Sequence, residues 1–318
     1  MKTTTNNESR QRTRNQVNER NGVFRFMDRQ IRELKAANRL RTAENYQQAR
    51  SSLYQFLGGR EISFRSLNEP LVESYNNYLV RRGLLRNTIS FYMRIWRALY
   101  NKAVEQHLAR RYHPFHHVYT GIDHTQKRAV SERTIIRLKA LKLPEGSDLE
   151  FARDLFIFSY CTRGMSFVDI AYLRKSEVRS GMIRYTRKKT RQPLLICVEG
   201  PIRELVEKYS KRANSSPYLF PILPGEDPKS DYTHYRAALN RHNRLLQKLA
   251  DMLPGKKPLS SYTARHSWAS VARNLQIPLS VISAGLGHTS ERTTEIYLSS
   301  LDHSVVDSAN QRLLKRLK

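Results

Sequence analysis

Three kinds of side chain that suit chemistry on a phosphate ester lie close in sequence towards the end of the chain. An Arg-His-Ser-Trp run begins at Arg265, a Leu-Gly-His run ends at His288, and a tyrosine follows at Tyr297. A phenol oxygen can act as a covalent nucleophile, while guanidinium and imidazole groups stabilise the charge on an attacked phosphate. We therefore predict a phosphate-attacking site centred on residues 259–298, of the kind that exchanges DNA strands.

The composition supports a nucleic-acid partner. The 318 residues include 56 Lys and Arg against 28 Asp and Glu, which gives a formal charge of +28 and a pI near 10.4. Such a chain needs a polyanionic partner, and double-stranded DNA is the leading candidate. No apolar run is long enough to span a membrane, and the polar N-terminus lacks the apolar stretch of a secretory signal. We predict a cytoplasmic protein that does not bind membranes.

Cysteine and histidine residues give no signature of a metal site. Cys161 and Cys197 lie far apart in apolar segments, so we expect buried free thiols. His113, His116 and His117 follow one another in an irregular segment without partners at ligand spacing, and we interpret them as loop histidines. We predict neither a metal nor a cofactor.

The length and the apolar patterning predict two domains, the first helical and the second mixed, with a small sheet. Residues 1–20 are polar and basic and predict a flexible arm. Residues 21–110 predict a DNA-binding domain of four helices, which begin near Gly22, after Thr42, near Asn68 and near Asn87. Residues 111–130 lack periodicity and predict a linker. Residues 131–318 then form the second domain.

In the second domain, helices are predicted after Ser131, Ser147 and Ser166, the last two with capping-box spacing. The segments Met182–Arg187 and Pro193–Val198 predict a hairpin with the basic turn KKTRQ at its tip. Further helices are predicted at 201–211, 235–252, 262–275, 278–286 and 290–298. An apolar stripe in the last fourteen residues predicts a C-terminal helix that packs on its own domain or docks into a neighbouring subunit.

Basic residues on the fourth helix of the first domain are candidates for DNA contacts. Arg86, Arg94 and Arg97 fall outside its apolar stripe. Each is either part of a solvated face or a phosphate contact, and the overall charge favours the second interpretation for the group.

These motifs resemble the tyrosine recombinase, or phage integrase, family, and in particular the integrases of Bacteroidetes mobile elements. The resemblance extends from about residue 20 to residue 318. Its most specific motif is LGHTSERTTEIY, with the upstream ARHSWAS and the basic hairpin in the family's order. It implies a mainly α-helical fold with a small β-sheet, in which an N-terminal helical core-binding (SAM-like) domain precedes a tyrosine recombinase catalytic domain.

The resemblance also implies a role for each site residue. Tyr297 would attack the scissile phosphate and form a 3′-phosphotyrosyl link, without metal or ATP. Arg265 and His288 would bind the nonbridging phosphate oxygens. Lys189 in the hairpin turn would protonate the leaving 5′ oxygen, with Lys188 as the alternative. His266, beside Arg265, is expected to contact DNA, to support the fold or to orient its neighbours.

Two positions depart from the family pattern. Tyr262 stands where a histidine is usual, and a phenol is a much poorer base near neutral pH. Ser166 stands where the first catalytic arginine is usual. Either Arg163 supplies the guanidinium from a shifted position, or Ser166 caps a helix while Arg163 contacts DNA or an acidic neighbour. Loss of one phosphate-binding donor costs roughly a hundred- to a thousandfold in rate, which predicts a slow enzyme.

Taken together, the sequence predicts a site-specific DNA recombinase that integrates, excises or inverts a mobile element. Strand exchange between two duplexes implies a homotetramer on DNA, and an accessory DNA-bending protein is a possible partner. The alternatives are a type IB-like topoisomerase, which acts on one duplex, and a DNA-binding protein of the same fold with weakened catalysis.

Overall fold

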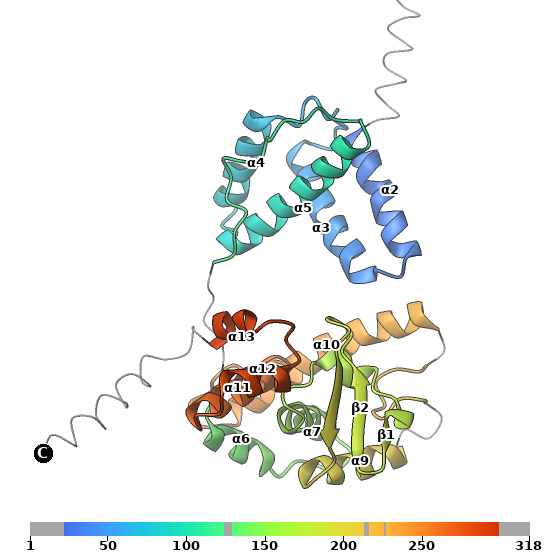
Figure 1. Ribbon diagram of the computed structural model, residues 1–318, viewed down its shortest axis with the longest axis vertical. Coiled ribbons are helices and arrows are strands. Elements are labelled where there is room, and N and C mark those ends of the chain that lie inside the picture. Colours follow the sequence, from blue (N-terminus) through green and yellow to red (C-terminus); the bar gives the residue numbers. More distant parts are fainter. Residues whose placement is uncertain (1–21, 124–128, 213–215, 226, 299–318) are drawn as a thin grey trace, which may run out of the picture. The chain divides into compact units, whose positions relative to one another are not determined.

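The computed structural model describes residues 22–123, 129–212, 216–225 and 227–298, and it divides into two compact units, residues 1–124 and 125–318. The predicted arm at 1–20 and the predicted C-terminal helix lie outside the described residues. Each unit has its own hydrophobic core. The predicted fold class, mainly α-helical with a small sheet, is confirmed (Figure 1).

Amphipathic helices build the N-terminal unit around an aromatic and aliphatic core. Trp96 lies in this core at 1% exposure, and Phe24 meets its ring edge-on. The described helices of the unit are α2 (Val23–Ala36), α3 (Leu40–Phe56), α4 (Glu69–Arg81) and α5 (Arg86–Glu105). The predicted cap at Thr42 is wrong, because α3 already begins at Leu40. Asn68 does cap α4, since its side chain accepts a hydrogen bond from the Leu71 amide.

The first part of the predicted linker is folded onto the N-terminal unit. Phe115 is buried in its core at 4% exposure and lies edge-on to Tyr100. Further along, Ser90 on α5 donates a hydrogen bond to the Gly121 carbonyl. An apolar anchor and side-chain bonds to the backbone therefore order residues that lack any helical or strand period.

The C-terminal unit is organised around α7, which contacts several other helices of the unit (Figure 1). Its helical elements are α6 (Glu132–Lys139), α7 (Asp148–Cys161), α8 (Phe167–Ala171), the short 3₁₀ helix η1 (Lys175–Glu177), α9 (Pro201–Arg212), α10 (Pro228–Asp251), α11 (Thr263–Asn274), α12 (Leu279–Leu286) and α13 (Glu291–Leu298). Two bounds differ: α6, which the sequence predicts to reach about Leu143, ends at Lys139, and α10, predicted from residue 235, begins at Pro228.

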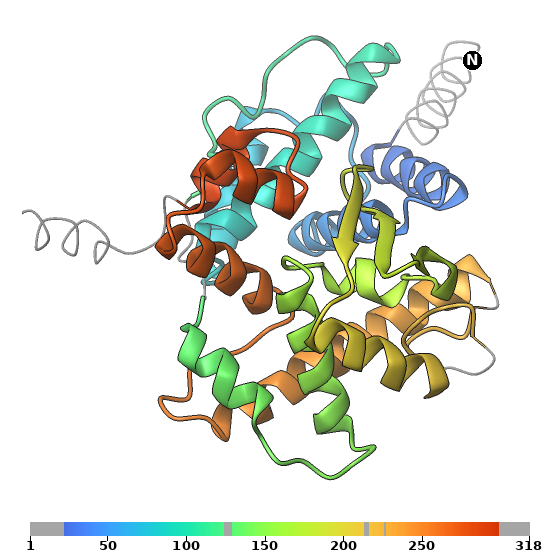
Figure 2. The same ribbon diagram turned by 60° about the horizontal axis from the view of Figure 1, so that its bottom comes forward.

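The sheet is a three-stranded antiparallel meander of β1 (Val178–Arg179), β2 (Met182–Thr186) and β3 (Pro193–Cys197). Met182 pairs with Cys197 and Thr186 pairs with Pro193, so the predicted hairpin is present. Figure 2 shows β2 and β3 (yellow-green to yellow) as a ribbon beside the helices of the unit. The short β1 strand is an addition to the sequence prediction.

Side chains at the helix starts and the two thiols refine the sequence prediction. Ser147 accepts a hydrogen bond from the Glu150 amide, as a helix cap does. Ser166 instead donates to the carboxylate of Asp169 at 2.6 Å, so its predicted capping box is wrong.

Both cysteines are free thiols, but only Cys161 is partly buried. Cys197 is exposed because it alternates away from the core-facing residues of β3.

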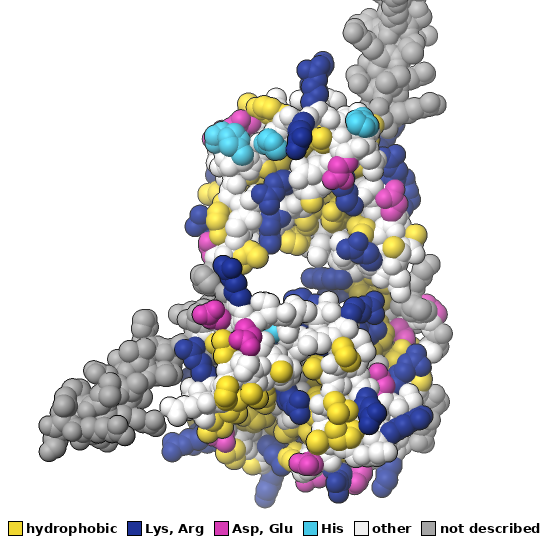
Figure 3. Space-filling view, viewed as in Figure 1, with side chains coloured by type: hydrophobic (Ala, Val, Ile, Leu, Met, Phe, Trp, Pro, Cys, Tyr) yellow, Lys and Arg dark blue, Asp and Glu magenta, His cyan; other side chains and the backbone are white. Residues whose placement is uncertain are grey.

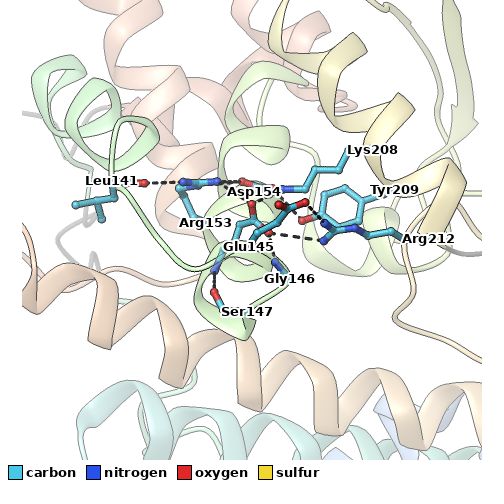
Figure 4. Close-up of polar contacts among 10 residues, drawn as sticks. Leu141, Glu145, Gly146, Ser147, Arg153, Asp154, Lys208, Tyr209 and Arg212 are labelled. Atoms are coloured by element: carbon cyan, nitrogen blue, oxygen red, sulfur yellow. Dashed lines mark hydrogen bonds and ion pairs between the residues drawn. The ribbon is translucent and has the colours of Figure 1, made fainter.

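A charged cluster joins α7 to α9 (Figure 4). The carboxylate of Asp154 is 4% exposed and accepts hydrogen bonds from Lys208 at 2.7 Å and from the Tyr209 hydroxyl at 2.9 Å. Arg153 pairs with the same carboxylate at 2.9 Å. A buried carboxylate is tolerated here because its oxygens are paired with cations and hydrogen-bond donors.

Replacing Asp154 with alanine should lower the free energy of unfolding by about 2–4 kcal/mol, because it leaves partly buried cations without a counter-charge. Urea unfolding measures the change. Glu145 is the matched control, since it pairs with Arg212 at 3.4 Å but its side chain is 88% exposed. Glu145→Ala should change the free energy of unfolding by less than about 0.5 kcal/mol. Equal losses of unfolding free energy in the two variants would show that burial of the Asp154 carboxylate does not set its contribution.

Candidate active site

Arg265 is buried in the C-terminal unit at 2% exposure, in the first turn of α11. Its Nη1 donates a hydrogen bond to the Gly164 carbonyl at 2.9 Å, and its Nη2 donates to the Leu286 carbonyl at 2.5 Å. The same Nη2 lies 3.2 Å from His288 Nε2. The guanidinium therefore joins three segments: the turn after α7, the end of α12 and the loop that follows α12.

The turn after α7 is shaped to receive Arg265. Arg163 and Gly164 both have positive φ angles, 59° and 74°. A Cβ atom added to Gly164 would lie 2.6 Å from Arg265 Cγ and 2.7 Å from its Cα. Only glycine fits so close to another backbone at this φ angle. Glycine at position 164 is therefore a packing requirement of the site.

His288 follows the left-handed Gly287 that ends α12. Its Nδ1 lies 2.8 Å from the Thr294 hydroxyl of α13. Because a guanidinium can only donate, the contact with Arg265 makes Nε2 an acceptor and places the ring proton on Nδ1. Burial, followed by the charges of Arg265, Arg187 and Lys189, lowers the pKa of His288 to about 4. The imidazole is therefore neutral at neutral pH.

Arg187, a second buried guanidinium, reaches the same loop from the hairpin. It is 4% exposed, and its Nη1 donates to the Gly287 carbonyl at 2.6 Å. Its Nε lies 3.9 Å from the carboxylate of Asp169. Within the described residues, this Nε has no hydrogen-bond acceptor within reach. Asp169 also accepts from the Ser166 hydroxyl and, at 2.9 Å, from the Lys188 amide.

Sequence reasoning missed Arg187, although a signal was present. Residues 183, 185 and 187 alternate inward along β2 and its extension, and all three are buried. An arginine on the core-facing side of a strand needs a polar partner, and here the partners are the carboxylate of Asp169 and the Gly287 carbonyl. Thr294 was also missed, because its contact with His288 depends on the path of the loop between α12 and α13.

The two hairpin lysines differ in their surroundings. Lys188 Nζ lies 3.6 Å from the centre of the Tyr172 ring, and partial burial, followed by Arg191, lowers its pKa. Lys189 is exposed in the turn and is close enough to His288 to lower the pKa of the imidazole. Lys189 is therefore within electrostatic range of His288, whereas Lys188 lies against an aromatic ring.

The other predicted site residues lie around this centre. Tyr262 is 42% exposed and precedes α11, with its ring edge-on to His266 at 4.9 Å. The aliphatic part of Arg163 lies near Gly285 on α12. Burial, followed by the charge of Asp169, raises the pKa of Tyr185, while the charges of Arg187, Arg265 and Arg163 oppose that rise.

Tyr297 belongs to α13, but its side chain lies outside the described residues. The Leu298 carbonyl accepts a hydrogen bond from Arg273 of α11 at 2.5 Å, and Leu298 is buried in a small core with Ile282 and Leu286. The helix that carries the candidate nucleophile is thus packed onto α11 and α12.

The predicted DNA contacts of the N-terminal unit are partly engaged within that unit. Arg86 stacks on Tyr119 at 3.9 Å and pairs with Asp123 at 3.5 Å. Arg97 donates to the Thr120 hydroxyl at 2.7 Å, and Arg94 is half-buried on the same helix. Figure 3 shows many Lys and Arg side chains on the visible face of each unit. Whether these three arginines contact phosphates stays a prediction.

Comparison with known families fits this geometry. The profile of the phage integrase SAM-like domain matches residues 22–118, and that of the phage integrase family matches residues 152–303. Together they cover most of both units, including Arg265 and His288. The chain belongs to the phage integrase family, the tyrosine recombinases. It is therefore a DNA-binding protein that acts in DNA recombination and integration.

Solved structures of integrases share the fold of this recombinase. Lambda integrase as a dimer on a COC′ core site gives a TM-score of 0.66 at 12% identity, covering 87% of this chain and 95% of that chain. The Tn1549 transposon integrase in complex with circular intermediate DNA gives 0.65 at 15% identity, covering 93% and 100%. A lambda integrase tetramer on a Holliday junction gives 0.64 at 13% identity, covering 87% and 77%.

A search of the curated proteins gave no match. No helix among the described residues of the recombinase is long and apolar enough to cross a membrane.

The buried His242 and the half-buried His288 predict that acid destabilises the recombinase. Burial lowers the pKa of His242 to about 3, and that of His288 is lowered to about 4. An unfolded histidine has a pKa near 6.5, so the unfolded chain binds more protons between about pH 6.5 and 4, and stability falls as the pH falls through this range. Melting temperatures across this window should show the loss.

A matched pair of variants isolates one of these histidines. His242 stacks on Phe167 with ring centres 4.8 Å apart, so His242→Phe should keep the packing and flatten the pH dependence. His113 is exposed, and His113→Gln should leave the pH profile unchanged. Identical slopes in wild type and His242→Phe would contradict the assignment.

Proposed function

We propose that the chain is a site-specific DNA recombinase that cleaves and rejoins DNA through a 3′-phosphotyrosyl intermediate on Tyr297. One observation carries the proposal. The guanidinium of Arg265 is held by the carbonyls of Gly164 and Leu286 beside His288, and α13, which carries position 297, contacts that same histidine through Thr294. Preorganised donors beside a tyrosine-bearing helix suit attack on a phosphate ester.

In the proposed reaction the phenol of Tyr297 releases its proton to solvent as its oxygen attacks phosphorus, and the bond from phosphorus to the 5′ oxygen breaks. Arg265 and Arg187 stabilise the charge on the nonbridging oxygens through planar guanidinium groups. The leaving 5′ oxygen takes a proton from Lys189. The new ester retains the energy of the phosphodiester, so the reverse attack by a 5′-hydroxyl rejoins the strand.

The Thr294 hydroxyl gives His288 a choice of proton position. A hydroxyl can accept a hydrogen bond from Nδ1–H or donate one to bare Nδ1. When a phosphate replaces the imidazole as a partner of Arg265, the ring proton can therefore move from Nδ1 to Nε2. The hydrogen bond between Nδ1 and the Thr294 hydroxyl is kept. In that tautomer Nε2 donates to a nonbridging oxygen, which is the role that the family resemblance implies.

Arg187 is our candidate for the guanidinium that Ser166 cannot supply. It is buried, it bonds to the residue before His288, and its charge lowers the pKa of that histidine. Arg163 remains the alternative from the sequence. The two differ in their contacts, since Arg163 Cδ lies near Gly285 whereas Arg187 donates to the Gly287 carbonyl.

The assembly and the biological role extend the proposal. A lambda integrase of the same fold is seen as a tetramer on a Holliday junction. By analogy, we propose that this recombinase acts as a homotetramer on two duplexes, to integrate or excise a mobile element. The kinship with Bacteroidetes elements, the accessory DNA-bending protein and the cytoplasmic location stay predictions.

A covalent trapping assay tests the proposal. A nicked duplex that carries an end of the element loses a short 5′-hydroxyl strand after cleavage, so the protein–DNA adduct accumulates. We expect an adduct with the wild-type chain and none with Tyr297→Phe at equal DNA occupancy. A wild-type chain that binds this duplex and forms no adduct would leave a DNA-binding protein of the same fold. Dependence on two matched sites separates a recombinase from a type IB-like topoisomerase.

A further inference from the structure

Three metal-ligand side chains from distant parts of the sequence meet on the N-terminal unit. Glu69, the first residue of α4, and the adjacent His116 and His117 have ligand atoms within 4.8 Å of one another. His117 Nε2 pairs with the carboxylate of Glu69, and the two imidazole rings have centres 3.4 Å apart. Figure 3 shows histidine side chains gathered on the surface of this unit.

Neighbouring groups orient two of these side chains as the outer partners of a metal site do. His116 Nδ1 lies 3.2 Å from the His113 carbonyl, which can only accept, so Nδ1 carries the proton and the lone pair is on Nε2. The Tyr112 hydroxyl donates to Glu69 Oε2 at 3.3 Å, which leaves Oε1 directed at the histidines. A ligating histidine typically donates its other ring N–H to a carbonyl in this way.

The backbone beneath the cluster is fixed on both sides. Phe115, directly before His116, is buried in the core of the unit. Asn68, directly before Glu69, caps α4. The ligands are therefore presented from anchored backbone, while their own side chains are free to adjust, since that of His117 is 60% exposed.

We propose that Glu69, His116 and His117 bind one divalent transition-metal ion, with Zn²⁺ as the best fit. Two imidazoles and a carboxylate are ligands that Zn²⁺ accepts in four-coordinate sites, where a water molecule completes the set. With bonds of about 2.0–2.2 Å, ligand atoms lie roughly 3.4 Å apart. Small rotations of exposed side chains close the present separations to that value.

The ion would tie the start of α4 to the segment after α5. The sequence alone predicts that His116 and His117 are loop residues. The third ligand, Glu69, is too far from them in the sequence to form a recognisable metal-binding spacing. Because the ligands would be preformed only in the folded unit, metal binding would stabilise the folded state. The stability of the DNA-binding unit would then depend on zinc.

The test uses the full-length chain without an affinity tag, with metal removed by chelation. Bound zinc is measured by equilibrium dialysis, Co²⁺ is used as a visible probe of tetrahedral coordination, and the melting temperature is followed as ZnSO₄ is added. We expect one zinc ion per chain, a Co²⁺ d–d absorption band, and a rise in melting temperature that saturates at one equivalent. MgCl₂ should cause no shift, because Mg²⁺ prefers six oxygen ligands.

Matched variants locate the ion. The double variant His116→Ala/His117→Ala and the single variant Glu69→Gln should each weaken zinc binding by more than about tenfold. Loss of a group that only orients a ligand already costs about tenfold, so loss of a ligand should cost more. His113→Ala is the control, because it removes a neighbouring imidazole and keeps the carbonyl that His116 uses. Circular dichroism confirms that each variant is folded. Equal zinc affinity in the wild type and the double variant, or no zinc bound by the wild type, would overturn the proposal.

Discussion

Arg187→Ala is expected to slow formation of the covalent DNA adduct by about a hundred- to a thousandfold, the usual cost of losing one preorganised donor. The guanidinium is buried beside the His288 loop, where water cannot replace its charge. Single-turnover adduct formation at saturating protein measures the effect, so a change in DNA affinity does not enter. Arg163→Ala, which removes the other candidate guanidinium, should slow the reaction by less than about tenfold.

A variant of Asp169, the partner of Arg187, separates the structural role of the arginine from its chemical role. Arg187→Ala leaves the buried carboxylate of Asp169 without its cation, so the variant should also lose stability. The double variant Arg187→Ala/Asp169→Asn removes both charges and should recover stability but not rate. A substrate with one nonbridging oxygen replaced by methyl carries no phosphate charge, and it should lose much of its dependence on Arg187. Recovery of the rate in the double variant would show that the arginine is only structural.

The second large effect is expected from Gly164→Ala. The added Cβ would lie 2.6–2.8 Å from Arg265 side-chain and backbone atoms, at a φ angle of 74°. The strained backbone costs about 1–3 kcal/mol. The clash must also displace Arg265, and a shift of about 1 Å in a catalytic group can cost a hundredfold in rate. Both the melting temperature and the rate of adduct formation should therefore fall.

Gly255 provides the control for backbone strain. It has a φ angle of 80°, and a Cβ at this position would meet nothing within 4 Å. Gly255→Ala should lose stability through the same left-handed strain and keep the wild-type rate. A normal rate in Gly164→Ala would show that Arg265 is not held by this close contact.

The sequence predicted the parts of the fold that depend on local pattern. Apolar periodicity located most helices, and β-rich segments around KKTRQ located the hairpin. Family membership and fold class were also predictable, because the motifs around Arg265 and His288 are specific. The boundaries were less accurate, as at Thr42, where a good capping residue lies inside a helix that starts earlier.

The sequence could not predict contacts that depend on tertiary structure. The Arg187–Asp169 pair joins a hairpin to a short helix, and the Glu69–His117 pair joins residues separated by the rest of α4 and all of α5. Neither has a characteristic spacing, because the intervening chain can vary without changing the contact. Phe115 gave a similar surprise, since one buried ring anchors a segment that has no period.

The carboxylate of Asp169 has a consequence for how the site can vary. It accepts from the Ser166 hydroxyl and pairs with Arg187, so it is a common counter-ion for positions 166 and 187. An arginine at position 166 beside Arg187 would place two buried cations on one anion, which is costly in a low-dielectric interior. We therefore expect the two positions to be epistatic: they are alternative places for one positive charge, and the effect of a substitution at one should depend on the residue at the other.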